Sequence, residues 1–522
     1  MILVLGSGPA GVAASTALLR NRHQVTMVDA GLSLEPSRRR LVKQLSSTSP
    51  AAWDTAAVYR FKREGGVTLR SAPLKKIFGS TFPYDGVADS FPIRTSDVGC
   101  VGSFGCGGLS TVWGAAILPY SEADTHDWPL PIGDLAEGYR EVARLFTVVS
   151  EDDDLQRLLP IDSPTIRVPK SAQSTRLLEH LNCHRDSLRA DGVTFGSSRL
   201  AFNRCMAADC RLCGLCMYGC PYDLIYSSQQ TLTDLRQNSN FTYEPGWVAE
   251  RFSESRTGVR LRCRRVDGSG YADFSGDRLF LAAGALHTTR LLVRTLEAFN
   301  QPLRFKDSQY FLLPCFTSFR SRGVLKEQLY TLSQLFLEID DDAVSQHSVH
   351  LQVYTYSDLY LQLLRGMLKG LYHVALPVLK TFLEHFVILQ GFIHSKESNV
   401  IEGSLKRTPT GDILELHSIR NIALRQAKDR ILRKLHSLHS RTQLLPIDPM
   451  FKFASAGRGF HYGGSFAMMK DPRGFASDTL GRPSAFSRVH AVDATILPSV
   501  PATTITYSVM ANAWRIANTI AE

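Results

Sequence analysis

The stretch of sequence that decides the fold is Ile2-Leu3-Val4-Leu5-Gly6-Ser7-Gly8-Pro9-Ala10-Gly11. Residues 2–5 are a continuous apolar run, which is typical of a strand buried on both faces. Residues 12–20 are rich in Ala and Leu and predict a helix, and residues 25–28 predict a second strand that ends at Asp29. The glycines therefore form a G-x-G-x-x-G fingerprint in its required strand–turn–helix–strand context, which predicts a dinucleotide-binding unit.

Each residue of this fingerprint has a physical role. Gly6 permits the tight turn, Gly8 lets the backbone approach a pyrophosphate, and Gly11 lets the helix pack closely on the strand. The N-terminus of the helix supplies positive potential for phosphates. Asp29 stands at about the right distance for an acid that binds a ribose hydroxyl. The fingerprint alone does not separate NAD from FAD.

Length and composition exclude disordered and fibrous proteins. The chain has 522 residues, which predicts two to three domains, and it is 44% hydrophobic and 21% charged. Its net charge of +10 favours an anionic partner, such as a membrane surface, without excluding a generically basic surface. We expect no nucleic-acid partner.

The first residues lack the features of a secretory signal, so we expect a cytoplasmic protein, with export beside a signal-bearing partner as an alternative.

Three later segments resolve the choice of cofactor. Residues 105–114 form a second glycine-rich loop, and residues 278–281 predict a strand that leads into a tight turn at Gly284 and a helix. Residues 461–468 and 492–498 carry two further motifs, and a last helix is expected over residues 504–520.

In these motifs the chain resembles the glucose–methanol–choline (GMC) family of flavin oxidoreductases, over both ends and much of the middle. The H-x-x-G-[ST]-x-x-M pattern of the family is met by His461, Gly464, Ser465 and Met468. Its D-A-[ST]-x-x-P pattern is met by Asp493, Ala494, Thr495 and Pro498. The resemblance implies FAD, bound extended across the first domain, and a substrate domain whose sheet covers the reactive face of the isoalloxazine ring.

The expected fold class is α/β, with a Rossmann-like FAD-binding domain interleaved with an α+β substrate domain built on an antiparallel sheet. The FAD-binding domain is expected to comprise residues 1–45, 95–125, 225–300 and 480–522. The substrate or cap domain is expected to comprise residues 46–94, 126–204 and 301–479, with a cysteine-rich metal loop at 205–221. The residues expected to bind FAD are Gly6, Gly8, Gly11, Asp29, Gly107, Gly108, Ser110, Val248, Gly284, Asp493 and Ala494.

The chemistry expected of a flavin and an alcohol calls for a base. The flavin takes a hydride from a CH–OH carbon at its N5, and the protein must remove the hydroxyl proton. The resemblance places His461 at the flavin face, and histidine has a suitable pKa. The family normally carries a second His or Asn at the position where this chain has Thr504. Thr504 is therefore a candidate partner of His461, with Thr503 or Thr506 as substitutes.

A cysteine cluster is the second strong signal. Five of the ten cysteines lie close together, at Cys205, Cys210, Cys213, Cys216 and Cys220. From Cys210 the spacing is C-x₂-C-x₂-C-x₃-C-P, which is typical of a ferredoxin iron–sulfur site, and Cys205 is a further candidate ligand. Some dehydrogenases of the GMC family carry a cluster in this region. We expect a 4Fe-4S or 3Fe-4S cluster; zinc and a cysteine-rich loop without metal, open or disulfide-linked, remain alternatives.

These signals together predict an FAD-dependent dehydrogenase that oxidises a CH–OH group. Its electrons are expected to leave through the iron–sulfur cluster to an external acceptor rather than to oxygen. One alternative is a redox-neutral flavin epimerase that acts on a sugar or a lipid-linked sugar. Another is a non-catalytic electron-transfer flavoprotein.

The middle of the chain is expected to form the substrate side. Residues 305–355 alternate apolar and polar residues, which predicts antiparallel strands, and residues 385–405 continue the pattern. Residues 359–389 are densely apolar but carry Arg365, Lys369 and Lys380, which predicts two amphipathic helices broken at Pro377. These helices either pack on the substrate sheet or lie in a membrane interface, in which case the substrate or acceptor is lipid-like.

Two histidines outside the motifs are further candidates for a functional role. His287 follows the Gly284 turn, and we expect it at the surface rather than in contact with the cofactor. His394 lies in an apolar segment and receives no role.

Overall fold

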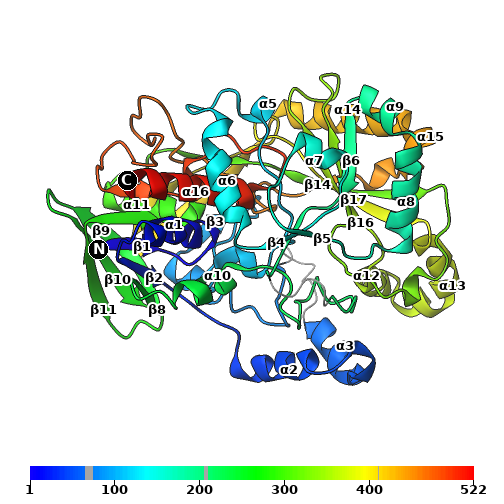
Figure 1. Cartoon of the computed structure of the whole chain (residues 1–522), viewed down its shortest axis with the longest axis horizontal. Helices are drawn as coiled ribbons and strands as arrows, with labels where there is room; N and C mark the ends of the chain where they lie inside the picture. The colour runs from blue at the N-terminus through cyan, green and yellow to red at the C-terminus, as the bar shows by residue number, and fades with distance from the viewer. Residues whose placement is uncertain (65–73, 205–209, 410, 522) are drawn as a thin grey trace.

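The computed structural model of the chain describes residues 1–64, 74–204, 210–409 and 411–521 (Figure 1). Cys205, one of the predicted metal ligands, lies outside the described residues. The chain forms a parallel sheet, called the nucleotide-binding layer after its predicted role, and a large antiparallel sheet, with connections that pass repeatedly between them.

The nucleotide-binding layer is a five-stranded parallel sheet in the order β23-β12-β1-β2-β8. Its strands are β1 (Ile2–Leu5), β2 (Val25–Asp29), β8 (Phe241–Pro245), β12 (Arg278–Leu281) and β23 (Val489–Ala491). Every side chain of β1 and β2 is buried, as expected of strands covered on both faces. The sheet therefore joins segments from the start, the middle and the end of the sequence.

Helices cover this sheet and complete the Rossmann-like unit. α1 (Pro9–Arg20) follows the glycine loop and packs against α16 (Ile505–Ala521), the last helix of the chain. α11 (Ala285–Thr295) follows Gly284. The expected helices at residues 12–20 and 504–520 are thus present within a few residues of their predicted bounds.

The second layer is a seven-stranded sheet in the order β20-β14-β17-β16-β15-β6, with β21 paired to β14, and every pairing in it is antiparallel. Its strands are β6 (Val193–Ser197), β14 (Tyr310–Thr317), β15 (Leu335–Ile339), β16 (Val349–Tyr354), β17 (Phe386–Phe392), β20 (Leu444–Pro446) and β21 (Lys452–Phe453). One face packs against α8 (Ala172–Cys183) and α14 (Ile422–Ser437) in a common apolar core. The expected α/β class with an antiparallel substrate sheet is confirmed.

A third sheet connects the two layers. It has the order β22-β13-β18-β19-β3, with β3 (Ile93–Thr95), β13 (Leu303–Asp307), β18 (Val400–Thr408), β19 (Gly411–Ile419) and β22 (Tyr462–Gly463). The pairing of β22 with β13 fixes the segment that begins with His461 between the nucleotide-binding layer and the antiparallel sheet.

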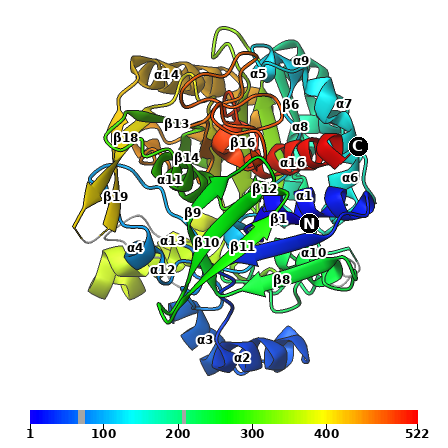
Figure 2. The same cartoon turned by 90° about the vertical axis from the view of Figure 1, so that its left-hand side faces the viewer.

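The remaining elements are smaller. The strands are β4 (Thr147–Val149), β5 (Thr165–Ile166), β7 (Leu200–Phe202), β9 (Trp247–Glu254), β10 (Val259–Arg265) and β11 (Tyr271–Gly276), the last three forming the ribbon in front of β1 and β12 in Figure 2. The helices are α2 (Pro36–Ser46), α3 (Thr55–Glu64), α4 (Val87–Ser90), α5 (Glu122–Thr125), α6 (Ala136–Ala143), α7 (Asp154–Leu158), α9 (Arg185–Ala190), α10 (Ser228–Leu235), α12 (Asp358–Leu368), α13 (Tyr372–Leu383) and α15 (His439–Thr442).

The apolar segment 359–389 differs from its prediction in two ways. Pro377 does not break the helices but lies inside α13, and the break falls at Lys369–Leu371, where Lys369 adopts a positive φ of 45°. The end of the segment is not helical, because residues from Phe386 onward pair with β14 and β16 as β17. Within the described parts of the chain, no helix is both long and apolar enough to span a bilayer.

Candidate functional site

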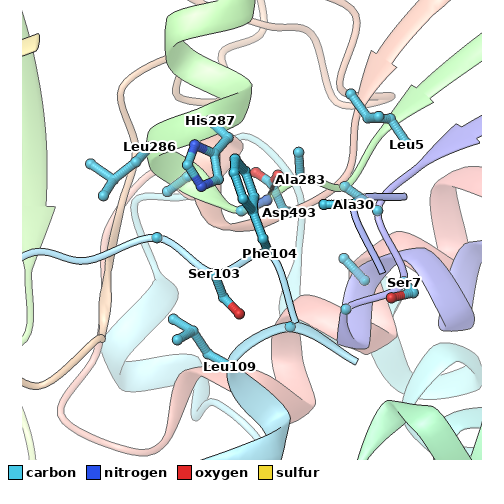
Figure 3. A pocket seen from close by; sticks show the side chains of 18 of the residues that line it. Leu5, Ser7, Ala30, Ser103, Phe104, Leu109, Ala283, Leu286, His287 and Asp493 are labelled. Atoms are coloured by element: carbon cyan, nitrogen blue, oxygen red, sulfur yellow. Dashed lines mark hydrogen bonds between the residues drawn. The ribbon is translucent and has the colours of Figure 1, made fainter. Parts of the chain in front are cut away.

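A cavity opens where β1, β2 and β12 end, at the carboxyl edge of the parallel sheet (Figure 3). Most of the residues predicted to bind FAD line it, namely Gly6, Gly8, Asp29, Gly108, Val248, Gly284, Asp493 and Ala494. Phe460 and Tyr462, on either side of His461, line it as well. The cavity therefore joins the two ends of the chain, as a shared nucleotide site requires.

The three fingerprint glycines are required for different reasons. A Cβ atom on Gly11 would lie 1.9 Å from the carbonyl oxygen of Gly6, and one on Gly6 would lie 2.6 Å from that of Ala282, so both positions allow close packing within the protein. Gly8 has an ordinary φ of −65°, and a Cβ on it would meet nothing within 4 Å. Neither packing nor backbone conformation requires glycine there, so the open space above Gly8 suits a bound group.

Two helices begin at the cavity without a side-chain cap. α1 starts after Gly8 and α11 starts after Gly284, and neither N-cap residue offers a side-chain acceptor to the first backbone N–H groups. Uncapped N–H groups and the helix dipole together favour an anion. The cavity therefore has the donor set that a pyrophosphate needs.

Asp29 is held by the hydroxyl groups of Ser7, in the first glycine-rich loop, and Tyr243, on β8. Its Oδ2 accepts hydrogen bonds from Ser7 Oγ (2.5 Å) and Tyr243 Oη (2.9 Å), and Ser7 Oγ accepts one from the backbone N–H of Gly107 (2.9 Å). Burial raises the pKa of Asp29 to about 6, and the two hydroxyl donors oppose that shift. Asp29 lines the cavity where a ribose is expected, and it also ties the first loop to the second.

Asp493 fixes the carboxy-terminal segment to the start of α11. Its Oδ2 accepts from the backbone N–H of Gly284 (2.9 Å) and from Thr288 Oγ1 (2.5 Å), and its Oδ1 accepts from the backbone N–H (2.9 Å) and the hydroxyl of Thr495. Burial raises the pKa of Asp493, and these donors lower it. The D-A-[ST] motif thus connects the carboxy-terminal segment to the start of α11, and both of these line the cavity.

Three predicted cofactor residues do not line this cavity. Gly11 packs against the strand, as its predicted role requires. Ser110 Oγ donates to the carbonyl of Gly107 (2.5 Å) and accepts from the backbone N–H of Ser228 (2.9 Å). Ser110 and Gly107 therefore stabilise the conformation of the second loop without lining this cavity.

His287 was predicted at the surface, and this prediction is wrong. It is buried in the cavity wall, where its ring packs on Phe91 (4.4 Å between centroids) and Phe104 (5.6 Å), as Figure 3 shows for Phe104. Its Nε2 has no hydrogen-bond partner among the described residues, and burial lowers its pKa to about 3. Its place directly after the Gly284 turn was the signal that could have identified it.

His461 lies between the cavity wall and the antiparallel sheet. Its ring stacks on Phe392 of β17, with centroids 4.8 Å apart and planes 22° apart. Burial lowers its pKa to about 3, and the neighbouring His350 contributes to the shift. Nδ1 has no partner within the described structure, while part of the side chain stays accessible. The residue is thus a neutral imidazole with an unused ring nitrogen.

The threonines near the start of α16 differ in their contacts. Thr504 Oγ1 accepts a hydrogen bond from the backbone N–H of Leu118 (3.1 Å), which leaves its own hydrogen available to another acceptor. Thr503 Oγ1 is buried without a partner in the part of the chain that is described, and Thr506 lines the cavity. Each of the three remains a candidate for the second polar position.

The four described cysteines of the metal loop are not disulfide-bonded. The pKa of Cys213 rises to about 12 through burial and through Cys216 and Cys210, which shows that these thiols lie near one another. In residues 1–64, 74–204, 210–409 and 411–521, no group of three or more ligand-type side chains is placed to hold one metal ion. The disulfide-linked alternative therefore fails for these four cysteines, and a single zinc ion does not fit their present arrangement.

A second cavity, of about 470 Å³, separates this loop from the second glycine-rich loop. Cys216 and Cys220 line one side, and Cys106, Ser110 and Trp113 line the other. Lys75 also lines it, donates from Nζ to the carbonyl of Trp113 (3.0 Å), and interacts with Cys216. A cation thus lies beside the thiols.

Comparison with known proteins identifies the fold. No model of a protein family and no curated protein matches the sequence. Pyridoxine 4-oxidase from Mesorbium loti matches in structure with a TM-score of 0.59 and 16% identity, over 99% of this chain and 98% of the oxidase. A variant of formate oxidase from Aspergillus oryzae RIB40, studied for its FAD modification, matches with a TM-score of 0.62 and 12% identity, over 99% of this chain and 97% of the formate oxidase. The chain has the fold of these two oxidases. At such low identity the match concerns the fold, and it extends over both layers described above.

Proposed function

We propose that the protein binds FAD and is an oxidoreductase of the GMC family that oxidises a CH–OH group. The observation that carries this proposal is the neutral His461, placed between a nucleotide-type cavity and the antiparallel sheet. The full-length likeness to two oxidases, one of them an FAD protein by description, supports it. The open space above Gly8 and the uncapped starts of α1 and α11 fit the pyrophosphate.

Different residues of this chain would have separate roles in the proposed oxidation. FAD, when bound, supplies the acceptor of a hydride. His461 accepts the hydroxyl proton of the alcohol on its unprotonated ring nitrogen, because burial keeps the imidazole neutral. Phe392 holds the plane of that ring by stacking. Thr504 accepts from the backbone N–H of Leu118 and keeps its own hydrogen for a second hydrogen bond, as the second polar position would require.

The proposed function is tested by adding alcohols anaerobically to protein reconstituted with FAD. Persistent bleaching of the flavin with ketone or aldehyde formation is expected. Transient bleaching with an inverted alcohol would indicate epimerisation instead. Absence of bleaching with every alcohol, despite bound FAD, would indicate electron transfer without catalysis and would contradict the proposal.

We further propose that the cysteine loop holds a 4Fe-4S or 3Fe-4S cluster through which electrons leave. The ferredoxin spacing from Cys210 to Cys220 supports it, since a cluster distributes its thiolates over several irons rather than one ion. The neighbouring thiols, the 470 Å³ cavity and the cation of Lys75 fit a negatively charged group. The two structurally similar oxidases lend this step no support.

Replacement of one cysteine tests the cluster. In Cys213→Ser protein purified anaerobically, we expect iron and acid-labile sulfide to fall to less than about half of wild type, since four thiolates normally hold such a cluster. Cys183→Ser is the matched control, because Cys183 is an exposed cysteine on α8 outside the loop. Wild-type protein without iron and sulfide would contradict the cluster proposal.

We also propose that α12 and α13 rest on a membrane surface and that the substrate or acceptor is lipid-like. Val374 and Val378 lie one turn apart on α13 and are 81% and 73% exposed. Residues 359–383 contain Arg365, Lys369 and Lys380 but no Asp or Glu. An exposed apolar strip that carries these cations suits an anionic lipid surface, and the acids at the two ends of the segment, Asp358 and Glu384, pair with Lys62 and Arg320. The two helices lie at the same edge of the molecule as α2 and α3 in both views (Figures 1 and 2).

Vesicle flotation tests this surface. With vesicles of phosphatidylcholine and phosphatidylserine, we expect wild-type protein to float and the double variant Val374→Ser, Val378→Ser to stay in the soluble fraction. Loss of two exposed valines corresponds to about 2–3 kcal/mol of burial and so to a roughly 30–150-fold weaker partition. Ile422→Ser removes an equally exposed apolar side chain elsewhere and should float as wild type does. Wild-type protein that does not float would contradict the proposal.

A further inference from the structure

The second glycine-rich loop forms a common wall between the two cavities. Gly105, Gly108 and Leu109 line the first cavity, which is proposed to hold FAD. Their neighbours in the sequence, Cys106 and Ser110, line the second cavity. A molecule in the second cavity would therefore lie one loop away from the nucleotide, beside the cysteine loop that is proposed to carry electrons outward.

The charged side chains that line the second cavity are mostly cations. They are Arg39, Lys75 and Arg236, and Asp223 is the one acid among the described residues of its wall. None of the three cations forms an ion pair with an acid anywhere in the described structure. The cavity therefore carries a positive charge that the described chain leaves unbalanced.

Lys75 and Arg236 keep hydrogen-bond donors for another partner. The ammonium of Lys75 uses one of its hydrogens for the carbonyl of Trp113 and has others free. The guanidinium of Arg236 makes no hydrogen bond to any described residue and lies over the ring of Tyr243, 5.8 Å from its centroid. A guanidinium presents its N–H groups in a planar fork that matches a carboxylate or a phosphate. The donors that an anionic group needs are thus present and unused.

A cluster on the cysteine loop does not account for Arg236. The charge of Arg236 acts on the thiol of Cys106, in the second glycine-rich loop. Lys75, by contrast, interacts with Cys216 of the cysteine loop. A cluster bound to that loop would be balanced by Lys75 and would leave Arg236 for a second anion.

The rest of the cavity wall is apolar and largely aromatic. Ile77, Phe78, Phe82, Trp113 and Ile225 line it. The volume of about 470 Å³ lies within the range of small-molecule sites, which combine apolar walls with a few polar groups that fix orientation. Exposed arginines alone would indicate only a basic surface, whereas cations in the wall of an aromatic cavity indicate a ligand with a flat apolar body and an acidic group.

We propose that the second cavity binds the electron acceptor, and that this acceptor is a small aromatic anion, such as a quinone that carries a carboxylate or sulfonate group. The reaction balances, because the alcohol loses two electrons and two protons as it becomes a carbonyl compound, and the quinone gains two of each as it becomes a hydroquinone. The inference rests on the proposed oxidation, which supplies these electrons. The lipid-like molecule proposed for the membrane surface is then the substrate rather than the acceptor.

Binding in the cavity is tested without turnover. The probe is anthraquinone-2-sulfonate, and anthraquinone-2-sulfonamide has the same rings without the charge. By calorimetric titration of the FAD-loaded protein, we expect wild type to bind the sulfonate about tenfold more tightly than the sulfonamide, the effect of one charge-assisted hydrogen bond. Arg236→Gln should remove most of this preference, because it removes the free guanidinium.

Arg433→Gln is the matched control, because Arg433 is an exposed arginine on α14 that lines neither cavity. It should keep the wild-type preference for the sulfonate. Equal binding of the two probes by wild type, or an unchanged preference in Arg236→Gln, overturns the assignment of the cavity. Loss of the preference in both variants would show adventitious binding to a basic surface and would overturn it as well.

The role in electron transfer is tested by turnover of an alcohol with the anionic dye dichlorophenolindophenol as acceptor. Anthraquinone-2-sulfonate should compete with the dye and not with the alcohol, and Arg236→Gln should raise KM for the dye about tenfold. Competition with the alcohol would place the probe in the substrate site and overturn the proposal. If no alcohol reduces the flavin, the proposed oxidation fails and the acceptor role fails with it, whereas the titration still decides whether the cavity binds aromatic anions.

Discussion

Replacement of His461 by asparagine is expected to slow anaerobic flavin reduction by about 10²–10⁴-fold, the usual effect of losing a positioned base. The ring lies on Phe392 with an unused nitrogen, and asparagine keeps the polarity of the site while removing the basic nitrogen. FAD binding should persist, because Phe460 and Tyr462, rather than His461, line the nucleotide cavity. The measurement is the rate of absorbance loss at the flavin maximum after rapid mixing with alcohol.

The pH dependence gives a second readout for His461. The neutral imidazole is the active form, and burial lowers its pKa to about 3 from an ordinary value near 6.5. A group with a lowered pKa stays deprotonated until the pH falls through that lower value. We therefore expect no loss of rate from this residue between pH 8 and pH 5. A drop in rate centred near pH 6.5 that disappears in His461→Asn would contradict the neutral, buried base.

His385→Asn is the control for this experiment. His385 is a partly buried histidine whose Nδ1 bonds to the carbonyl of Thr317, and it lines neither cavity. Its substitution should leave the rate of flavin reduction unchanged. A His461→Asn protein with the wild-type rate would show that another group takes the proton.

Replacement of Gly8 by valine is expected to weaken FAD binding by about 10–100-fold, as overpacking by 1–3 kcal/mol does. Gly8 has an extended backbone that any residue can adopt, and its Cβ would meet no protein atom within 4 Å. The added side chain therefore fills only the space assigned to the pyrophosphate. The measurement is the dissociation constant of FAD, from fluorescence titration of the apoprotein.

Gly133→Val is the matched control, because a Cβ at Gly133 also meets nothing within 4 Å, and Gly133 is exposed away from the cavity. The free energy of unfolding of both variants should stay within about 1 kcal/mol of the wild-type value. A difference of this size at position 8 is the effect of replacing the glycine N-cap of α1 by a poor N-cap residue. FAD binding by Gly8→Val as tight as that of wild type would contradict the location of the pyrophosphate.

The local signals in the sequence predicted the nucleotide-binding layer well, for a physical reason. Gly6, Gly8 and Gly11 act within a single strand–turn–helix unit, so their spacing carries most of the information that fixes their geometry. Asp493 is local only in part, since Thr495 is two residues away, whereas Gly284 and Thr288, which it binds at the start of α11, come from a distant segment. The cysteine spacing is equally local, but it does not reveal what the thiols bind.

Features that depend on contacts between distant segments were not predictable. The alternation in residues 348–354 indicated a strand, but not that its polar side would be buried as well as its apolar side. His287 was placed at the surface because Phe91 and Phe104, which cover it, lie far earlier in the chain. Lys369 interrupts the apolar helices through a positive φ, which no pattern of apolar residues specifies.

The order of strands in the parallel sheet has a consequence for biosynthesis. β1 pairs with β12, and β12 pairs with β23, so segments that are synthesised far apart in time belong to one sheet. At about 5–20 residues per second, the amino-terminal strand waits roughly 25–100 s for its sheet to be completed. The nascent chain must meanwhile avoid aggregation through its unpaired apolar strands.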